Sequence, residues 1–127
     1  MNEEENKMGI IEKMRLDGKA IYVTGGASGI GKSVATAFAE AGADVAIVDI
    51  NLEGAAEVAQ EIAGATGSKT IAVQCDVTKK DEVEAMVAKV ADTYGKLDAC
   101  FNNAGICLNV PAEEMSLDQW KKVMDIN

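Results

Sequence analysis

The chain of 127 residues contains no histidine. This absence removes the side chain that most often serves as a general base near neutral pH, the usual protein ligand of zinc, and the central member of a Ser-His-Asp triad. Any chemistry in which this chain takes part therefore depends on a bound cofactor, and no metal site is expected.

Basic residues are also scarce. Lysine and arginine number 12 against 21 acidic residues, so the formal net charge is −9. A nucleic-acid partner would call for a basic surface and is not expected. No apolar run approaches the roughly 18–20 residues of a membrane span. The N-terminus lacks an apolar segment of the signal-peptide type. We therefore expect no membrane partner and a cytoplasmic location.

The cysteines show no redox or metal-binding spacing. There are three of them, without a Cys-x-x-Cys pair. Two fall within apolar runs, which favours small buried thiols over a redox or metal site. With 48% hydrophobic residues, the chain can form one compact domain with a core, and it is too short for two.

The chain divides into a short extension and one regular domain. Residues 1–17 show weak periodicity and three consecutive acids, Glu3 to Glu5, and they are interpreted as an N-terminal extension. Ile10, Ile11, Met14 and Leu16 could dock a short helix on the body. From residue 18 to 127, short apolar segments near residues 20–23, 45–48, 70–75 and 97–101 alternate with segments of helical periodicity.

This alternation predicts an α/β fold. Nearly continuous apolar strands are buried on both faces, so the sheet is expected to be parallel and covered by helices. In the first long helix, the spacing of Ile30, Val34, Phe38 and Ala41 predicts the buried face. A last helix is expected to begin at Ser116, because Ser116 and Gln119 form a capping-box pattern.

A glycine-rich turn follows the first strand. Gly25, Gly29 and Gly31 lie between that strand and the first long helix. The pyrophosphate of a dinucleotide needs tight backbone curvature, close approach and a free helix N-terminus at this point of the fold. The turn is therefore a candidate phosphate-binding element, although a glycine-rich turn alone is weak evidence.

A nucleoside triphosphatase is the rival interpretation of the same residues. Residues 26–33 fit the P-loop pattern G-x-x-x-x-G-K-[ST], and residues 45–49 imitate a Walker B strand. However, Asp49 lies 18 positions after Gly31 (49 − 31), close to the roughly 20 expected of a ribose-binding acid. Gly29 also supplies an additional glycine that a P-loop does not need. Both features favour a dinucleotide.

Four motifs in order resemble the short-chain dehydrogenase/reductase family. They are Thr24-Gly25-x-x-x-Gly29-Ile30-Gly31, Asp76-Val77, Asn102-Asn103-Ala104-Gly105 and, within the last helix, Asn127. The resemblance covers residues 16–127. It implies a Rossmann-type parallel sheet of strand order 3-2-1-4, flanked by helices and truncated before the family's fifth to seventh strands. It also implies a nicotinamide cofactor and hydride transfer to or from an alcohol or carbonyl substrate.

The resemblance assigns a role to each motif. Backbone N–H groups of Ser28, Gly29, Ile30 and Gly31 would hold the pyrophosphate. Asp76 would accept from the adenine amino group while Val77 frames the ring. Asn103 and Ala104 would pass beneath the adenosine ribose, where Gly105 leaves room. Asn127 matches the catalytic asparagine that holds a water in the family's proton relay.

Asp49 bears on which cofactor is bound. A carboxylate there would accept both ribose hydroxyls of NAD and repel the 2′-phosphate of NADP. NADP-preferring relatives typically carry a basic residue just before the second signature glycine or after the second strand. Ser28 and Ile50 occupy these positions, so NAD is expected rather than NADP.

The family's catalytic serine and Tyr-x-x-x-Lys motif do not occur. Neither Tyr22 nor Tyr94 has lysine four residues on. We therefore expect the N-terminal half of an enzyme, from a truncated gene, an incomplete read or a proteolytic fragment, and no turnover by this chain alone. A non-catalytic dinucleotide-binding regulatory module is the alternative. The fourth strand and the last helix around Trp120 and Met124 would expose apolar surface, and the full-length form is expected to be a homo-oligomer.

Overall fold

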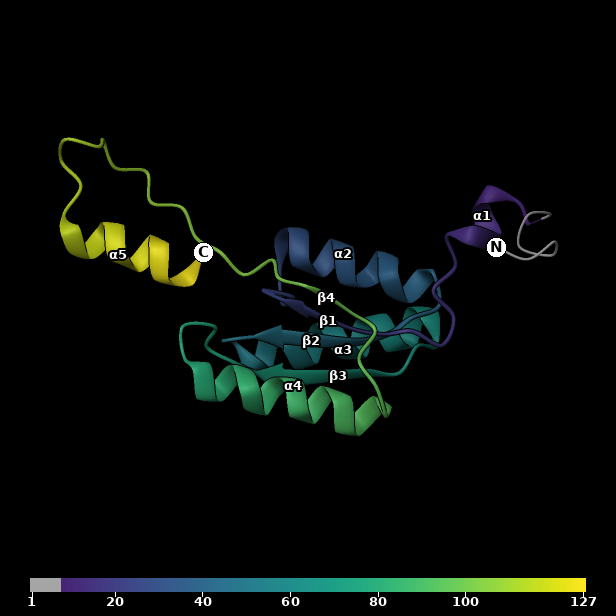
Figure 1. The fold of residues 1–127 in the computed structure, drawn as a ribbon. Coiled ribbons are helices and arrows are strands. Elements are labelled where there is room, and N and C mark those ends of the chain that lie inside the picture. The colour runs from purple at the N-terminus through teal and green to yellow at the C-terminus, as the bar shows by residue number, and fades with distance from the viewer. Residues whose placement is uncertain (1–7) are drawn as a thin grey trace.

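The computed structural model describes residues 8–127, so the acidic run at residues 3–5 lies outside the described part. The elements are α1 (Ile10–Lys13), β1 (Ala20–Thr24), α2 (Gly29–Glu40), β2 (Asp44–Asp49), α3 (Leu52–Thr66), β3 (Thr70–Gln74), α4 (Lys80–Tyr94), β4 (Ala99–Phe101) and α5 (Leu117–Ile126). The four strands are parallel and lie in the order β3-β2-β1-β4 (Figure 1). This confirms the predicted Rossmann-type sheet.

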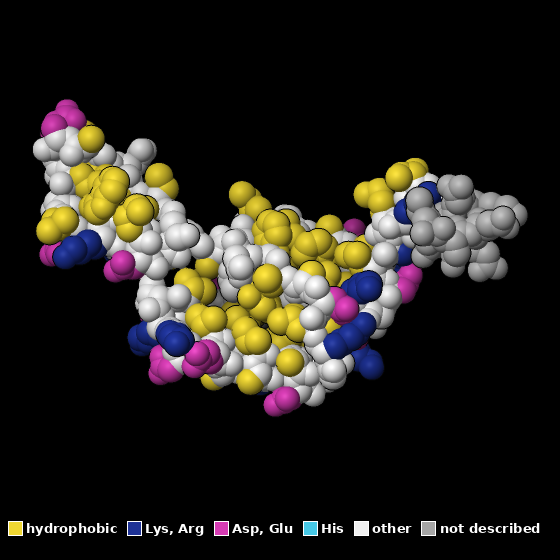
Figure 2. All heavy atoms as spheres, viewed as in Figure 1, with side chains coloured by type: hydrophobic (Ala, Val, Ile, Leu, Met, Phe, Trp, Pro, Cys, Tyr) yellow, Lys and Arg dark blue, Asp and Glu magenta, His cyan; other side chains and the backbone are white. Residues whose placement is uncertain are grey.

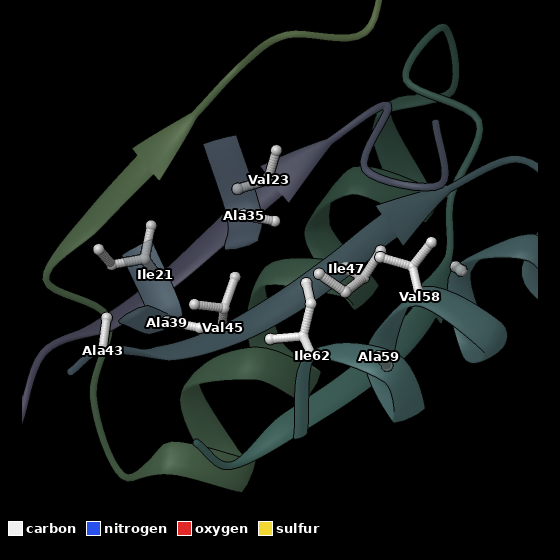
Figure 3. Close-up of a cluster of buried hydrophobic side chains, with 11 residues drawn as sticks. Ile21, Val23, Ala35, Ala39, Ala43, Val45, Ile47, Val58, Ala59 and Ile62 are labelled. Atoms are coloured by element: carbon white, nitrogen blue, oxygen red, sulfur yellow. The ribbon is translucent and has the colours of Figure 1, made fainter. Parts of the chain in front are cut away.

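Helices cover the two faces of the sheet. Ile21 and Val23 of β1 pack with residues of α2 and α3, whereas Tyr22 between them packs on the other face with Met86 and Val90 of α4. Side chains of successive strand residues point to opposite faces, so a continuous apolar strand fills both cores. Figure 3 shows the first core, where Ile62 of α3 lies against the β2 strand.

The buried face of α2 differs from the prediction. Gly31, Ala35 and Ala39 face the sheet and are buried, while Ile30 is 73% exposed. Small residues at this spacing let the helix axis approach the strands closely. The close packing gained in this way decides which face is buried, and the face with the larger side chains is not the one chosen. Phe38 is partly buried against the same core and also packs edge-on against Phe101 of β4, with ring centroids 6.2 Å apart.

The predicted docking of the N-terminal helix is also wrong. α1 forms, but Ile10 and Ile11 are each 70% exposed, and Met14 is exposed as well. Leu16 alone of the four predicted residues packs against the core. The helix has a single turn, too short to present a continuous apolar stripe to the body.

β4 is an exposed edge strand of the sheet, as predicted. All three of its residues are exposed, including Cys100. Cys107 is exposed too, so of the three cysteines only Cys75 is a buried thiol, and the expectation of two is wrong. Cys100 lies in an apolar run, but the edge strand that carries it is exposed along its three residues.

α5 stands apart from the sheet at the end of an extended segment (Figure 1). Its start is fixed by the predicted capping box, in which Ser116 Oγ accepts from the Gln119 N–H and the Gln119 side chain accepts from the Ser116 N–H. Leu117, Trp120 and Met124 are exposed, and Figure 2 shows apolar side chains gathered over this helix. Between residues 8 and 127 the structure has no helix long and apolar enough to cross a membrane.

Candidate functional site

A cavity of about 180 Å³ opens where the carboxyl ends of the strands meet. Parallel strands all point their carboxyl ends to one edge of the sheet, and open α/β sheets bind ligands there. Residues that follow β1, β2, β3 and β4 contribute to its wall, together with the end of α5. The lining residues are Thr24, Gly25, Val48, Asp49, Ile50, Cys75, Asp76, Val77, Ala104, Gly105, Ile106 and Ile126.

The cavity brings together most of the residues predicted from the motifs. Seven line it: Gly25, Asp49, Ile50, Asp76, Val77, Ala104 and Gly105. Ser28 precedes α2, and Gly29, Ile30 and Gly31 form the first turn of that helix. These four residues do not line the cavity, but Gly31 packs against Gly25, which does. The Asn103 side chain packs against Gly25, where a Cβ would lie 3.1 Å from Asn103 Nδ2. Asn127 lines a neighbouring cavity.

The glycine turn is packed too tightly for side chains. A Cβ on Gly31 would come within 2.7 Å of the Gly25 carbonyl carbon and 2.8 Å of Asn103 Nδ2. Gly25 has a φ of +64°, which favours glycine, and a Cβ there would lie 3.1 Å from the Ala104 Cα. These two glycines therefore let the turn, the α2 start and the 103–104 segment approach one another.

The start of α2 leaves N–H groups available. The first N–H groups of a helix have no intrahelical acceptor. Ser28 is the N-cap, yet its side chain makes no capping hydrogen bond. The positive end of the helix dipole lies at the same point. An anionic group is the ligand that such a terminus accepts.

Thr24 joins the end of β1 to the segment that follows β4, and the sequence analysis did not predict this role. Its Oγ1 accepts hydrogen bonds of 3.0 Å from the N–H groups of both Asn103 and Ala104. Asn103 Nδ2 donates in return to the Thr24 carbonyl, at 3.2 Å. Thr24 is 4% exposed. The signal available in the sequence was its position directly before the glycine turn.

The Asp49 carboxylate is fixed by backbone donors. Oδ2 accepts from the Ala27 N–H at 3.1 Å, and Oδ1 accepts from the Asn51 N–H at 3.0 Å. Asn51 caps α3 in turn, since its Oδ1 accepts from the Gly54 N–H. A carboxylate oxygen has more than one acceptor position, so both oxygens can still accept from a ligand in the cavity.

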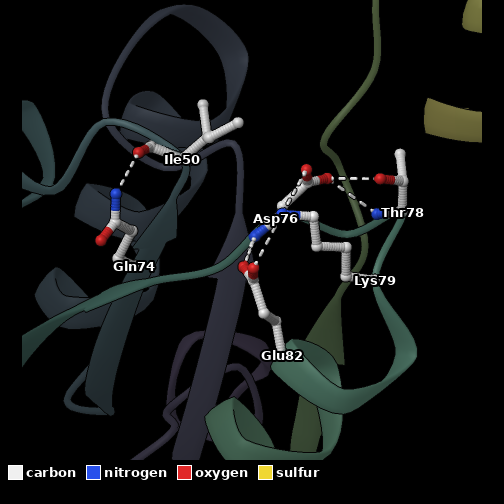
Figure 4. A network of polar contacts seen from close by, with 6 residues as sticks. All are labelled: Ile50, Gln74, Asp76, Thr78, Lys79 and Glu82. Carbon is white, nitrogen blue, oxygen red and sulfur yellow. Dashed lines mark hydrogen bonds and ion pairs between the residues drawn. The ribbon is translucent and has the colours of Figure 1, made fainter.

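Asp76 is held in a polar network at the end of β3 (Figure 4). Its Oδ1 accepts from the Thr78 hydroxyl at 2.7 Å and the Thr78 N–H at 3.0 Å. These hydrogen bonds, and then the nearby Lys79 ammonium, hold the pKa of the Asp76 carboxyl below its usual range. Gln74 Nε2 donates to the Ile50 carbonyl and so ties the end of β3 to the turn after β2.

Asn127 is joined to the segment after β4 by two hydrogen bonds. Its Oδ1 accepts from the Ile106 N–H at 2.8 Å, and its Nδ2 donates to the Ile106 carbonyl at 3.0 Å. The side chain lies near Gly105, whose hypothetical Cβ would be 3.3 Å from Oδ1. This pair of bonds fixes the end of α5 beside the cavity.

The apolar wall of the cavity was missed by the sequence reasoning. It comprises Val48, Cys75, Ile106 and Ile126. Each one directly precedes or follows a predicted site residue, and that adjacency was the only signal. Burial raises the pKa of the Cys75 thiol, so this group is neutral. The wall is suited to the flat apolar face of a ring.

The P-loop interpretation fails on the two residues that distinguish it. A P-loop lysine reaches the phosphates and its Ser/Thr hydroxyl binds Mg²⁺. Lys32 Nζ is instead paired with Glu61 Oε2 of α3 at 2.7 Å, and Ser33 Oγ donates to the Gly29 carbonyl at 3.2 Å. Both groups are engaged away from the cavity.

The chain was compared with known protein families. Residues 19–127 match the family described as short chain dehydrogenase. The chain belongs to this family. Among solved structures, the chain is similar to a short-chain type dehydrogenase/reductase from Mycobacterium marinum, with a TM-score of 0.90 and 37% identity. That match covers 94% of this chain and 48% of the other.

Two curated relatives illustrate the range of the family. The chain is 43% identical over 113 residues to the D-threitol dehydrogenase of Mycolicibacterium smegmatis, which covers 89% of this chain and 43% of that protein. It is 40% identical over 119 residues to the NAD-dependent glycerol dehydrogenase of Listeria innocua, covering 94% and 45%. The chain therefore spans less than half the length of these relatives.

Proposed function

We propose that this chain is the cofactor-binding half of an NAD-dependent oxidoreductase that transfers hydride between nicotinamide and an alcohol or carbonyl substrate. One observation carries the proposal. A glycine turn at an uncapped helix start, a ribose-type carboxylate (Asp49) and a second carboxylate (Asp76) adjoin one cavity with an apolar wall. This set of donors and acceptors is complementary to the phosphates, ribose hydroxyls and adenine of a dinucleotide.

The residues fit the cofactor from its phosphates to its adenine. The N–H groups of Ser28, Gly29, Ile30 and Gly31 would bind the pyrophosphate, on a turn whose close packing depends on the absence of Cβ atoms at Gly25 and Gly31. Asp49 would accept from the ribose hydroxyls. Asp76 and Val77 would take the adenine, with Asn103, Ala104 and Gly105 beneath the ribose. The bound cofactor would supply or accept the hydride.

NAD is proposed rather than NADP. The Asp49 carboxylate would repel a 2′-phosphate, and it is held in place by the Ala27 and Asn51 N–H groups. Ser28 and Ile50 supply no positive charge at the positions where NADP-preferring relatives carry one. The name of the Listeria innocua relative, an NAD-dependent glycerol dehydrogenase, supports the same choice.

Asn127 is proposed as the catalytic residue that this chain contributes, through a water of a proton relay. Its two hydrogen bonds to the Ile106 backbone would keep the amide in place. The substrate is proposed to be a small-molecule alcohol or carbonyl compound, consistent with the names of the threitol and glycerol dehydrogenases. We further propose residues 1–17 as an extension, residues 18–127 as the NAD-binding unit, and a cytoplasmic location without nucleic-acid or membrane partners.

A homo-oligomeric full-length protein is proposed from the α5 surface. Leu117, Trp120 and Met124 recur on one side of the helix at spacings of three and four residues, and all three are more than half exposed. An exposed apolar face of this kind is typical of a protein–protein contact.

Calorimetric titration of the chain with NAD, NADP and ATP tests the proposed function. NAD is expected to bind more tightly than NADP, and ATP more weakly than either. Absence of NAD binding would contradict the proposal, and tighter NADP binding would contradict the choice of cofactor alone. The non-catalytic module remains distinguishable, because it would bind NAD while the full-length protein showed no hydride transfer.

A further inference from the structure

Glu82 contacts two groups of the Asp76 network at once (Figure 4). It lies in the first turn of α4, and its Oε2 accepts from the Asp76 backbone N–H at 2.7 Å. Its Oε1 lies 3.3 Å from Lys79 Nζ. A single carboxylate therefore fixes the backbone at the end of β3 and pairs with the ammonium beside it.

Lys79 has two carboxylates within reach. Its Nζ lies 3.3 Å from Glu82 Oε1 and 4.0 Å from Asp76 Oδ2. The pKa of Lys79 is raised, first by its hydrogen bond to Glu82 and then by the charges of Glu82 and Asp76. The shorter contact with Glu82 is thus the one that holds the ammonium.

The two oxygens of Asp76 are not equivalent. Both hydrogen bonds from Thr78 reach Oδ1, so Oδ2 is the oxygen left to accept from a ligand in the cavity. The Lys79 ammonium is a competing donor for that oxygen, because it already lies 4.0 Å away at the end of a long, flexible side chain.

We propose that Glu82 is a positioning residue of the nucleotide site, holding the Asp76 backbone and keeping Lys79 away from Asp76 Oδ2. The consequence is selectivity for a base with an exocyclic amino group, which donates to that oxygen. This inference rests on the proposed function, in which Asp76 meets the adenine. Without Glu82, the ammonium shifts onto Oδ2 and occupies the acceptor.

A purely structural role for Glu82 makes a different prediction. An acidic residue in the first turn of α4 also stabilises the helix through its dipole. Loss of that effect lowers the stability of the chain without altering its preference between bases. The decisive quantity is therefore a ratio of two affinities measured on the same variant, which a change in stability alone leaves untouched.

The probes are NAD and nicotinamide hypoxanthine dinucleotide, in which an oxo group replaces the adenine amino group. Their affinities are measured by calorimetric titration for the unsubstituted chain and for Glu82→Ala, Glu82→Gln, Lys79→Ala and the double variant Lys79→Ala/Glu82→Ala. Glu84→Ala is the matched control, since Glu84 is an exposed acid of the same helix that pairs only with Lys80 in the described residues.

The unsubstituted chain is expected to prefer NAD by about tenfold, the value of one hydrogen bond to a charged acceptor. Glu82→Ala is expected to bring the ratio close to one, and Glu82→Gln to an intermediate value, because Gln still accepts from the Asp76 N–H but holds Lys79 less strongly. The double variant should recover much of the preference, since the Lys79 ammonium then no longer competes for Oδ2. Lys79→Ala and Glu84→Ala should retain it.

Two failures are distinguishable. If the unsubstituted chain binds no NAD, the proposed function is wrong and this inference falls with it. If the chain prefers NAD and Glu82→Ala keeps the same ratio, the proposed function stands and the role of Glu82 is wrong. A double variant no better than Glu82→Ala would overturn the part assigned to Lys79.

Discussion

The Oδ2 atom of Asp49 accepts a hydrogen bond of 3.1 Å from the backbone N–H of Ala27, in the middle of the glycine turn. The end of β2 is thereby joined to the turn after β1 through a side chain, beside the backbone bond from Gly26 N–H to the Val48 carbonyl. The carboxylate that is proposed to bind the ribose hydroxyls therefore also holds the conformation of the loop that is proposed to bind the pyrophosphate.

Replacement of Asp49 should consequently affect more than cofactor choice. We expect Asp49→Ala with Ile50→Arg to shift preference from NAD towards NADP, with NAD affinity lower by about tenfold or more. The shift follows from removing a negative charge and adding a positive one beside the 2′ position. Titrations with both cofactors measure it, and unchanged relative affinities would refute the assignment of Asp49.

The hydrogen bond between Ala27 and Asp49 can be tested separately, through the affinity of the glycine turn for inorganic pyrophosphate. Asp49→Ala alone should weaken binding of inorganic pyrophosphate, although Asp49 itself is an anion whose removal reduces repulsion. Asn51→Ala serves as the control, because it removes the α3 cap but leaves the Asp49 contact with Ala27. Stronger pyrophosphate binding by Asp49→Ala would show that charge repulsion outweighs loop shape.

Thr24→Val should destabilise the chain by about 2–3 kcal/mol, because two N–H groups, of Asn103 and Ala104, lose their acceptor. Valine keeps the shape of threonine, so the packing of β1 is retained. Thr24→Ser keeps the hydroxyl and should cost about 1 kcal/mol, the value of a lost methyl group. Urea unfolding measures both, and equal losses would show that the hydrogen bonds are unimportant.

Gly31→Ala should abolish binding of a dinucleotide and destabilise the chain, because the new Cβ would lie 2.7 Å from the Gly25 carbonyl carbon. Backbone atoms cannot rotate away as a flexible side chain can, so the glycine turn must move. Gly64→Ala is the matched control. Gly64 lies within α3 with open space around its Cβ position, and the change should stabilise the chain by about 0.5–1 kcal/mol.

Alkaline pH should destabilise the chain partly through Tyr22. Burial raises the pKa of its phenol from 10.0 to about 12, and the hydroxyl donates to Asn102 Oδ1 at 3.1 Å. The unfolded chain ionises first, so the contribution of Tyr22 to stability is present below pH 10 and is lost as the pH rises towards 12.

Tyr22→Phe tests this contribution, since phenylalanine keeps the ring and cannot ionise. The free energy of unfolding of this variant should fall less between about pH 9.5 and pH 11.5 than that of the unsubstituted chain. Parallel pH dependences of the two proteins would show that Tyr22 is not responsible. The comparison is made on the differences with pH, because the variant also loses a hydrogen bond.

The glycine turn and the motif residues could be predicted from the sequence because their signals are local. Gly25, Asp49 and Asp76 each stand directly after a short apolar strand, and a parallel sheet brings such positions to one edge. Glycine is the residue that permits close approach of two backbone segments, so the sequence itself indicates the tight packing at Gly31. Ser116 and Gln119 likewise fixed the start of α5 through neighbouring backbone groups.

Contacts between distant segments could not be predicted in this way. Nothing near Thr24 in the sequence indicates that its hydroxyl accepts from Asn103, 79 positions away. Lys32 matches the P-loop pattern, and only the folded structure shows that its ammonium pairs with Glu61 of another helix. The partner of a side chain depends on which elements pack together, and packing is a property of the whole chain.

The sequence by itself determined the order of strands and helices, the parallel sheet and the edge where the candidate site residues meet, because hydrophobic periodicity and turn residues act over a few positions. The tertiary structure decided which face of α2 is buried, where small residues at Gly31, Ala35 and Ala39 permit close packing. It also decided that Asp49 holds the glycine turn and that Glu82 pairs with Lys79 beside Asp76. Such contacts arise only when separate elements are brought together and side chains compete for the same partners.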